Sequence, residues 1–170
     1  MGFTHVTDIQ QYIPPSVFYK TAGTWTPTLA SNVVMDVRTA AAASFNVYIP
    51  IMGLPSSVVG SQGAKLTAIE VHYRVAVAVL SNISAVTLNR VRFRIPGQIP
   101  QGDVIPVTLD ADHLTDAERC AVDHHQMIVT VDTPTFIEKH QSNWLVMVCE
   151  GSANGVLTLH GAVARYTLRL

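Results

Sequence analysis

Apolar and polar residues alternate along the stretch Lys65–Ile95, which predicts two long β-strands. In its first half, β-branched residues and Tyr73 occupy the odd positions, whereas Glu70, His72 and Arg74 occupy even ones. A period of two with β-branched residues on one side is typical of a half-buried strand. A short polar segment suited to a turn precedes the second alternating run. We therefore expect a long β-hairpin at the centre of the fold.

Shorter alternating runs on both sides of this hairpin predict further strands. Val33–Arg38 and Ser44–Ile51 alternate, and Pro50 places the end of the second run at an edge or rim. Thr115 followed by Glu118 is a capping box and predicts one short helix. That helix is expected at residues 116–122, and the later strands at residues 104–109, 125–132, 143–150, 156–160 and 163–170, the last two separated by Gly161.

The order of these elements predicts an all-β domain. Strand, turn and strand recur without alternating helices, which favours a single-domain antiparallel β-sandwich of the jelly-roll type over residues 24–170. Residues 1–23 lack sustained periodicity and are expected to form an extended N-terminal arm, which packs on its own domain or reaches a neighbouring subunit. An immunoglobulin-like sandwich is the alternative, although its Cys–Trp–Cys pattern is missing.

The low charge of the chain changes this picture. Charged residues make up 14% of the sequence, against about 25% in an average soluble domain. Either other subunits cover much of the surface, or the chain is a small-residue β-protein. The net charge of −1 gives no global basic field for nucleic acid. Apolar runs fall far short of the ~20 residues that a membrane helix needs, and no secretion signal is expected because the N-terminus has no apolar core.

Acidic and histidine residues concentrate around the predicted helix, and these are the side chains that ligate metals. The spacing does not fit an EF-hand, but a calcium site of another geometry at Asp110, Asp112 and Asp116 remains open. The alternatives are a solvated loop whose acids favour the start of the helix, or contacts between subunits. No other cofactor is expected.

The histidines and cysteines do not predict a zinc site. His124 and His125 would point to opposite faces of a strand, so a metal-dependent enzyme would need His113 and nearby acids to converge with them. Cys120 and Cys149 match no metal spacing, and a buried free thiol is expected for Cys149. No catalytic motif such as GxSxG is present, so the chain is expected not to be an enzyme.

Arg90, Arg92 and Arg94 share one face of the second strand of the expected hairpin. Three guanidiniums on one face repel each other unless anions neutralise them. The face is expected to be a subunit contact or a solvated surface, with Glu70 as a counter-charge. Nucleic acid is a weaker explanation because aromatic residues do not interleave with these arginines.

The aromatic residues leave two explanations open. They could form a stacking platform for sugars, or they could anchor the core and a subunit interface. Tyr12 and Tyr19 are the candidates for the interface. The five residues that a platform could use are Trp25, Trp144, Tyr12, Tyr19 and Tyr48.

Several segments together resemble a family pattern: AGTWTPTLASNVV (22–34), KLTAIEVHY (65–73), DADHLTDAER (110–119), TPTFIEKHQSNWLV (133–146) and GAVARYTLRL (161–170). The chain resembles a loose group of small, uncharacterised all-β structural proteins from bacteriophage-like and environmental sequences. The resemblance implies a non-enzymatic subunit of a virion, such as a capsid, decoration, tail or tube protein. Its partners would be copies of itself, as a trimer or larger assembly, and other virion proteins. A carbohydrate-binding or adhesion module is the alternative.

Overall fold

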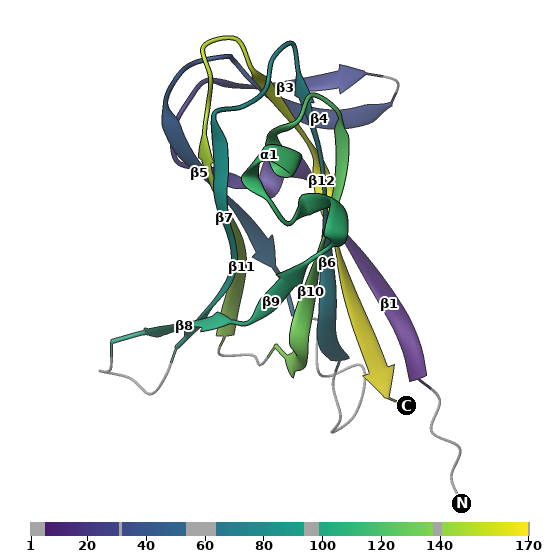
Figure 1. The fold of residues 1–170 in the computed structure, drawn as a ribbon. Helices are drawn as coiled ribbons and strands as arrows, with labels where there is room; N and C mark the ends of the chain where they lie inside the picture. The colour runs from purple at the N-terminus through teal and green to yellow at the C-terminus, as the bar shows by residue number, and fades with distance from the viewer. Residues whose placement is uncertain (1–5, 31, 54–63, 94–98, 138–140, 170) are drawn as a thin grey trace, which may run out of the picture.

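The computed structural model describes residues 6–30, 32–53, 64–93, 99–137 and 141–169. Over these residues the chain forms two antiparallel β-sheets, arranged as in a β-sandwich, and one short α-helix (Figure 1). This confirms the prediction of an antiparallel all-β chain. No helix in the described part of the chain is long and apolar enough to span a membrane.

The first sheet has seven strands in the order β3-β4-β12-β6-β10-β9, with β1 also paired to β12. Its strands are β1 (Val6–Ile13), β3 (Trp25–Ala30), β4 (Val33–Arg38), β6 (Ala64–Ala76), β9 (Val107–Leu109), β10 (His124–Phe136) and β12 (Val156–Arg169). The second sheet has five strands in the order β2-β5-β11-β7-β8. Its strands are β2 (Tyr19–Lys20), β5 (Ser44–Ile51), β7 (Asn82–Arg92), β8 (Gln101–Ile105) and β11 (Gln141–Glu150).

Short helical elements lie between the strands. Two 3-10 turns, η1 (Pro15–Val17) and η4 (Ala111–His113), precede β2 and α1, and α1 spans Asp116–Cys120. The predicted capping box is confirmed: the Thr115 hydroxyl accepts from the Glu118 backbone N–H, and the Glu118 carboxylate accepts from the Thr115 N–H. The helix ends two residues before the predicted position.

The core fills the space between the two sheets. On β6, Ile69, Val71, Tyr73 and Val75 are buried, as the alternation predicts, and they join buried side chains from both sheets in one cluster. Burying one such aliphatic side chain contributes roughly 1.5–3 kcal/mol. Cys149 lies in this core as a free thiol, which confirms the prediction, and burial raises its pKa to about 12.

The expected central hairpin is wrong. β6 and β7 are both long strands, but β6 belongs to the first sheet and β7 to the second. Between them Val77 adopts a left-handed backbone conformation, with φ of 72°. Alternation shows which side of a strand is buried, but it does not show which strand lies alongside. Here the two apolar faces meet across the core instead of sharing a sheet.

The C-terminal strands differ from the prediction in a related way. The strands expected at 156–160 and 163–170 form one strand, β12, and Gly161 marks a register shift instead of a break. Gly161 has φ of 129°, which side chains rarely adopt. This irregularity lets one strand pair with β4 before the shift and with β1 after it.

Most of the expected N-terminal arm belongs to its own domain. Residues 6–13 form β1 and pair with β12 of the same chain over eight residue pairs. Ile13 and Phe18 are buried in the core. Within the single chain, β1 and Phe18 therefore pack on their own domain, and a contact of residues 1–23 with a neighbouring subunit stays a prediction. Residues 1–5 lie outside the described residues.

Candidate functional site

The β3–β4 hairpin extends beyond the strand that anchors it. β3 pairs with β4 over six residue pairs, from Trp25↔Arg38 to Ala30↔Val33. In contrast, β12 pairs with β4 only through the three residues from Asp36 to Arg38. The outer half of the hairpin is therefore a two-stranded ribbon, and Figure 1 shows it projecting from the body of the molecule.

Apolar side chains on this ribbon are exposed. Leu29 is 68% exposed, Val34 47% and Val33 43%. Leu29 and Val34 are direct cross-strand partners, so their side chains share one face of the ribbon. An isolated two-stranded ribbon is marginally stable in water. The exposure of these apolar side chains to water makes the free ribbon still less favourable. The outer ribbon is a candidate interface.

The base of the hairpin is firmly held. Arg38 is fully buried, its guanidinium lies 4.2 Å from the centre of the Phe45 ring, and Nη1 donates to the carbonyl oxygen of Ala41 at 3.2 Å. The Trp25 ring packs edge-on against Phe45 at 5.8 Å. Lys20 forms an ion pair with Asp36. The ribbon therefore projects from a fixed base.

The predicted arginine face is placed differently from the expectation. Arg90 and Arg92 share a side of β7 with the buried Leu88. Both form ion pairs with Asp103 of the neighbouring β8, and Arg92 Nη2 lies 3.3 Å from its Oδ2. These arginines hold the pKa of Asp103 below its usual value, first through the hydrogen bond from Arg90. Their role in a subunit contact stays a prediction, and Arg94 lies outside the described residues.

The expected counter-charge, Glu70, lies on the other sheet. It forms an ion pair with Arg165 of β12, on the outer face of the first sheet. The predicted hairpin would have placed Glu70 beside the arginines. Because β6 and β7 belong to different sheets, Glu70 does not neutralise them.

The two tyrosines predicted at an interface are exposed and lie on different sheets. The Tyr12 hydroxyl on β1 donates to the carbonyl oxygen of His160 at 2.9 Å. The Tyr19 ring on β2 lies 5.7 Å from the Tyr48 ring. Their role as interface residues stays a prediction.

The three acids of the predicted calcium site do not converge. Asp110 accepts from the backbone N–H of Asp112 at 3.1 Å and of Ile128 at 2.5 Å, whereas Asp116 forms an ion pair with Arg119. Burial alone would raise the pKa of Asp110, but hydrogen bonds from His113 and the backbone outweigh it, so the pKa is lowered. Among the described residues, no group of three or more His, Cys, Asp or Glu side chains is arranged to hold a metal ion.

Asp110 instead begins a chain of contacts through two histidines. His113 Nδ1 lies 2.7 Å from Asp110 Oδ1, His113 Nε2 lies 3.2 Å from His125 Nδ1, and His125 Nε2 lies 2.9 Å from the carbonyl oxygen of Ala121. With an ionised carboxylate, these three hydrogen bonds require three ring protons, whereas two neutral imidazoles supply two. All three bonds therefore form together only when one ring is protonated.

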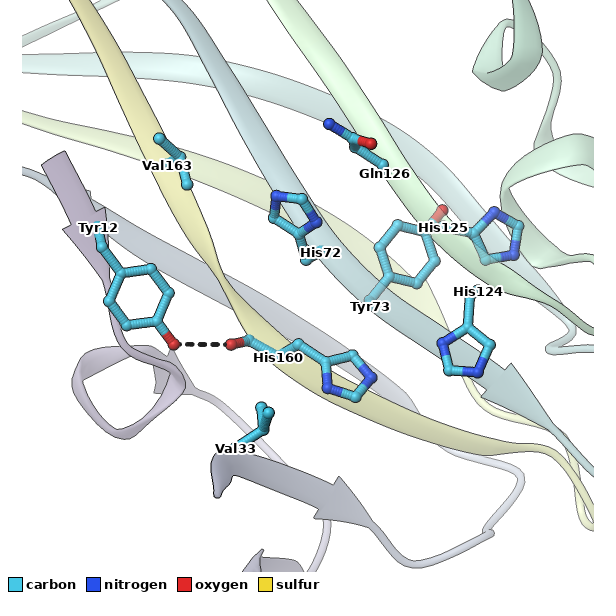
Figure 2. A pocket seen from close by; sticks show the side chains of 9 residues that line it. All are labelled: Tyr12, Val33, His72, Tyr73, His124, His125, Gln126, His160 and Val163. Carbon is cyan, nitrogen blue, oxygen red and sulfur yellow. Dashed lines mark hydrogen bonds between the residues drawn. The ribbon is translucent and has the colours of Figure 1, made fainter. Parts of the chain in front are cut away.

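A second group of histidines lies on the outer face of the first sheet, where no sequence pattern predicted a site. Figure 2 shows Tyr12, His72, His124 and His160 around a depression with a volume of about 580 Å³. His124 and His160 stack with ring centres 6.0 Å apart. We call this depression the histidine face. The signal that could have indicated part of it was the even-position run of His72 and Arg74, but the neighbours of β6 were unknown.

A second depression adjoins the histidine face. It has a volume of about 640 Å³, and its lining includes the acids Asp110, Asp112, Glu118 and Asp123. The two depressions share His124, His125 and Gln126. His124 and His125 contribute from opposite sides of β10, as predicted: His124 is exposed, whereas His125 stacks on Tyr73 at 4.6 Å.

No known protein-family model matches the chain, and no curated protein sequence matches it.

Proposed function

We propose that this chain is a non-enzymatic structural subunit that associates with copies of itself. The observation that carries the proposal is the projecting β3–β4 ribbon with its exposed Leu29, Val33 and Val34. A virion component, such as a capsid, decoration or tail-tube protein, is the proposed setting. The resemblance to bacteriophage-like structural proteins supports this setting.

A jelly-roll topology is part of this proposal. The links β4–β5, β5–β6, β6–β7, β8–β9, β10–β11 and β11–β12 each cross from one sheet to the other, whereas β7–β8 and β9–β10 each stay within one sheet. The first sheet contains the order β4-β12-β6-β10, and the second contains β5-β11-β7-β8. This alternation between the two sheets supports the proposed jelly roll, an architecture used by viral capsid proteins.

A second copy is the occupant that best fits the ribbon. Charged residues make up only 14% of the chain. Large parts of its surface can therefore be buried against a second copy without burying unpaired charges. Closed homo-oligomers are the commonest assemblies of soluble proteins. Contacts between the ribbon of one copy and the surface of the next can build dimers, trimers or larger lattices.

The test is the mass in solution of the intact chain and of a ribbon variant. We expect light scattering at about micromolar concentration to give a mass well above 18.4 kDa. The variant Leu29→Lys should lower that mass toward the mass of the monomer, because a charge cannot be buried at the contact without a partner. Val104→Lys is the matched control, since Val104 is also exposed but lies on β8.

A monomer near 18.4 kDa for the unmodified chain at all concentrations would contradict the proposal. If Leu29→Lys and the unmodified chain form oligomers of equal mass, the ribbon is not part of the interface. Circular dichroism of both variants shows whether either substitution disturbs the fold.

A carbohydrate-binding module is the second candidate function. One observation favours it: Tyr19, Tyr48 and Trp144 lie on the outer face of the second sheet, where Tyr48 follows the buried Val47 and Trp144 precedes the buried Leu145. Aromatic faces of this kind stack on sugars. A glycan screen tests it, and binding that Tyr19→Ala abolishes would favour this candidate.

A further inference from the structure

The centre of the histidine face is formed by three adjacent strands. In the strand register, His72 of β6 lies between Gly161 of β12 and Gln126 of β10. One row further along, Arg74 lies between Thr158 and His124. Imidazole and guanidinium groups from β6, β10 and β12 therefore gather on one surface.

His160 completes this group because of the irregularity in β12. It occupies the extra position between the pairs Leu159↔Tyr73 and Gly161↔His72. Its carbonyl oxygen accepts the hydrogen bond from the Tyr12 hydroxyl, which ties this point of β12 to β1. Its ring lines the depression, and its Nε2 is buried without a hydrogen-bond partner. Buried polar atoms in folded proteins are usually hydrogen-bonded to protein or to ordered water, so this nitrogen can accept a further partner.

The charges on this surface favour an anion. Arg74 is exposed and forms no ion pair within the described residues. Glu70, the nearest carboxylate on β6, is already paired with Arg165, and its Oε2 lies 3.7 Å from His72 Nε2. A metal ion is a poorer fit, since no set of three metal-ligating side chains converges among the described residues.

We propose that the histidine face binds a tetrahedral oxyanion of the phosphate class, held by Arg74, His124 and His160. The rings of His124 and His160 lie 6.0 Å apart and both line the depression, and Arg74 is the cross-strand partner of His124 at its border. Donors from three strands suit a tetrahedral anion better than a planar carboxylate, and charge-assisted hydrogen bonds are the stronger kind. The site goes beyond the proposed function and does not depend on it.

Binding at this site is linked to protonation. Burial lowers the pKa of His160, and the positive charges of His124, His72 and Arg74 lower it further. A bound anion opposes the last three effects, so it favours the protonated ring and binds more tightly as pH falls. The other charged groups around the face are Glu70 and Arg165, which pair with each other, and Asp123 beside His124.

The experiment is an NMR titration of the imidazole signals with inorganic phosphate, at constant ionic strength set with chloride. At pH 6 we expect saturable shifts of the His72, His124 and His160 ring signals, larger than any shift of His113, which does not line the depression. Binding should weaken at least about tenfold at pH 8. Phosphate itself gains negative charge between pH 6 and pH 8. Weaker binding at pH 8 would therefore come from loss of protons by the protein.

Thymidine monophosphate is the second probe, and the two probes separate the sources of the phosphate group. A response to both means that free phosphate suffices, and a response to the ester alone assigns an esterified phosphate. Either response supports the site. No saturable response to either probe would overturn it, as would equal affinity at both pH values.

Two variants test the assigned residues. Arg74→Gln and His160→Gln should each weaken binding about tenfold, as expected for loss of a charge-assisted hydrogen bond. Lys65→Gln is the matched control, because it removes one positive charge from an exposed residue at the other end of β6. Equal weakening by Lys65→Gln and Arg74→Gln would indicate general charge attraction and overturn the assignment. Arg74 is exposed, so its variant should fold even if the His160 variant does not.

Discussion

His125 is a buried histidine that makes stability depend on pH. Burial lowers its pKa, and the hydrogen bond to Ala121 only partly offsets this. Because the folded pKa lies below the unfolded value of about 6.5, the unfolded chain binds more protons as pH falls through that range. The free energy of unfolding should therefore decrease below about pH 6.5.

We expect His125→Gln to reduce this loss of stability at low pH. Urea unfolding at pH 5, 6, 7 and 8 measures the slope for both proteins. His160, whose pKa is also lowered, contributes to the slope that remains, and His160→Gln is the parallel variant. A slope that is identical in His125→Gln and the unmodified chain would show that His125 does not carry the effect.

The role of a single residue could be predicted where its contacts are with residues close to it in the sequence. The capping box of Thr115 and Glu118 lies within four positions of the sequence, and it is present in the structure. The histidine face joins His72, His124 and His160, which come from three strands. No local pattern relates those three positions, because their contact depends on which strands are neighbours.

Among the elements, β12 depends most clearly on one residue. Gly161 has φ of 129°, and a Cβ added there would lie 2.7 Å from Tyr12 Cε2 and 2.9 Å from the carbonyl oxygen of Ile13. Gly161→Ala combines backbone strain with a clash, so it should destabilise the fold by roughly 2–4 kcal/mol. Denaturant unfolding measures this change.

Gly102→Ala is the matched control for that substitution. A Cβ at Gly102 would meet only the carbonyl oxygen of Arg90, at an ordinary 3.9 Å. We expect this variant to change stability by less than about 1 kcal/mol. Similar losses for the two alanine variants would contradict the role assigned to the irregularity in β12.

Strand positions were easier to predict than strand partners. Val33–Arg38 and Ser44–Ile51 form β4 and β5 with the predicted bounds. Each of them pairs in the sheet with strands far away in sequence: β4 with β12 and β5 with β11. The side-chain period is a property of one strand, whereas partners are decided by how two sheets close over a common core. This is why the central hairpin prediction failed although both of its strands exist.

In the whole molecule, one long strand joins the parts that the sequence analysis treated separately. β12 pairs with β6 along one edge, and with β4 and then β1 along the other. The expected arm, the projecting ribbon and the histidine face all meet at β12. The strand that anchors the ribbon therefore also carries His160 of the histidine face.

The N-terminal strand gives the last prediction, at the scale of the whole fold. Deleting residues 1–13 removes eight residue pairs with β12 and the buried Ile13. Loss of a buried Ile side chain alone costs about 2–5 kcal/mol, and the freed edge of β12 is left open to aggregation. Because domains are stable by only about 5–15 kcal/mol, we expect the truncated chain to lose its cooperative thermal unfolding transition, measured by circular dichroism. A chain lacking only residues 1–5 keeps every β1 pair and is the control for shortening. If the chain lacking 1–13 instead unfolds as the full chain does and loses only its association, then β1 serves a neighbouring subunit in solution.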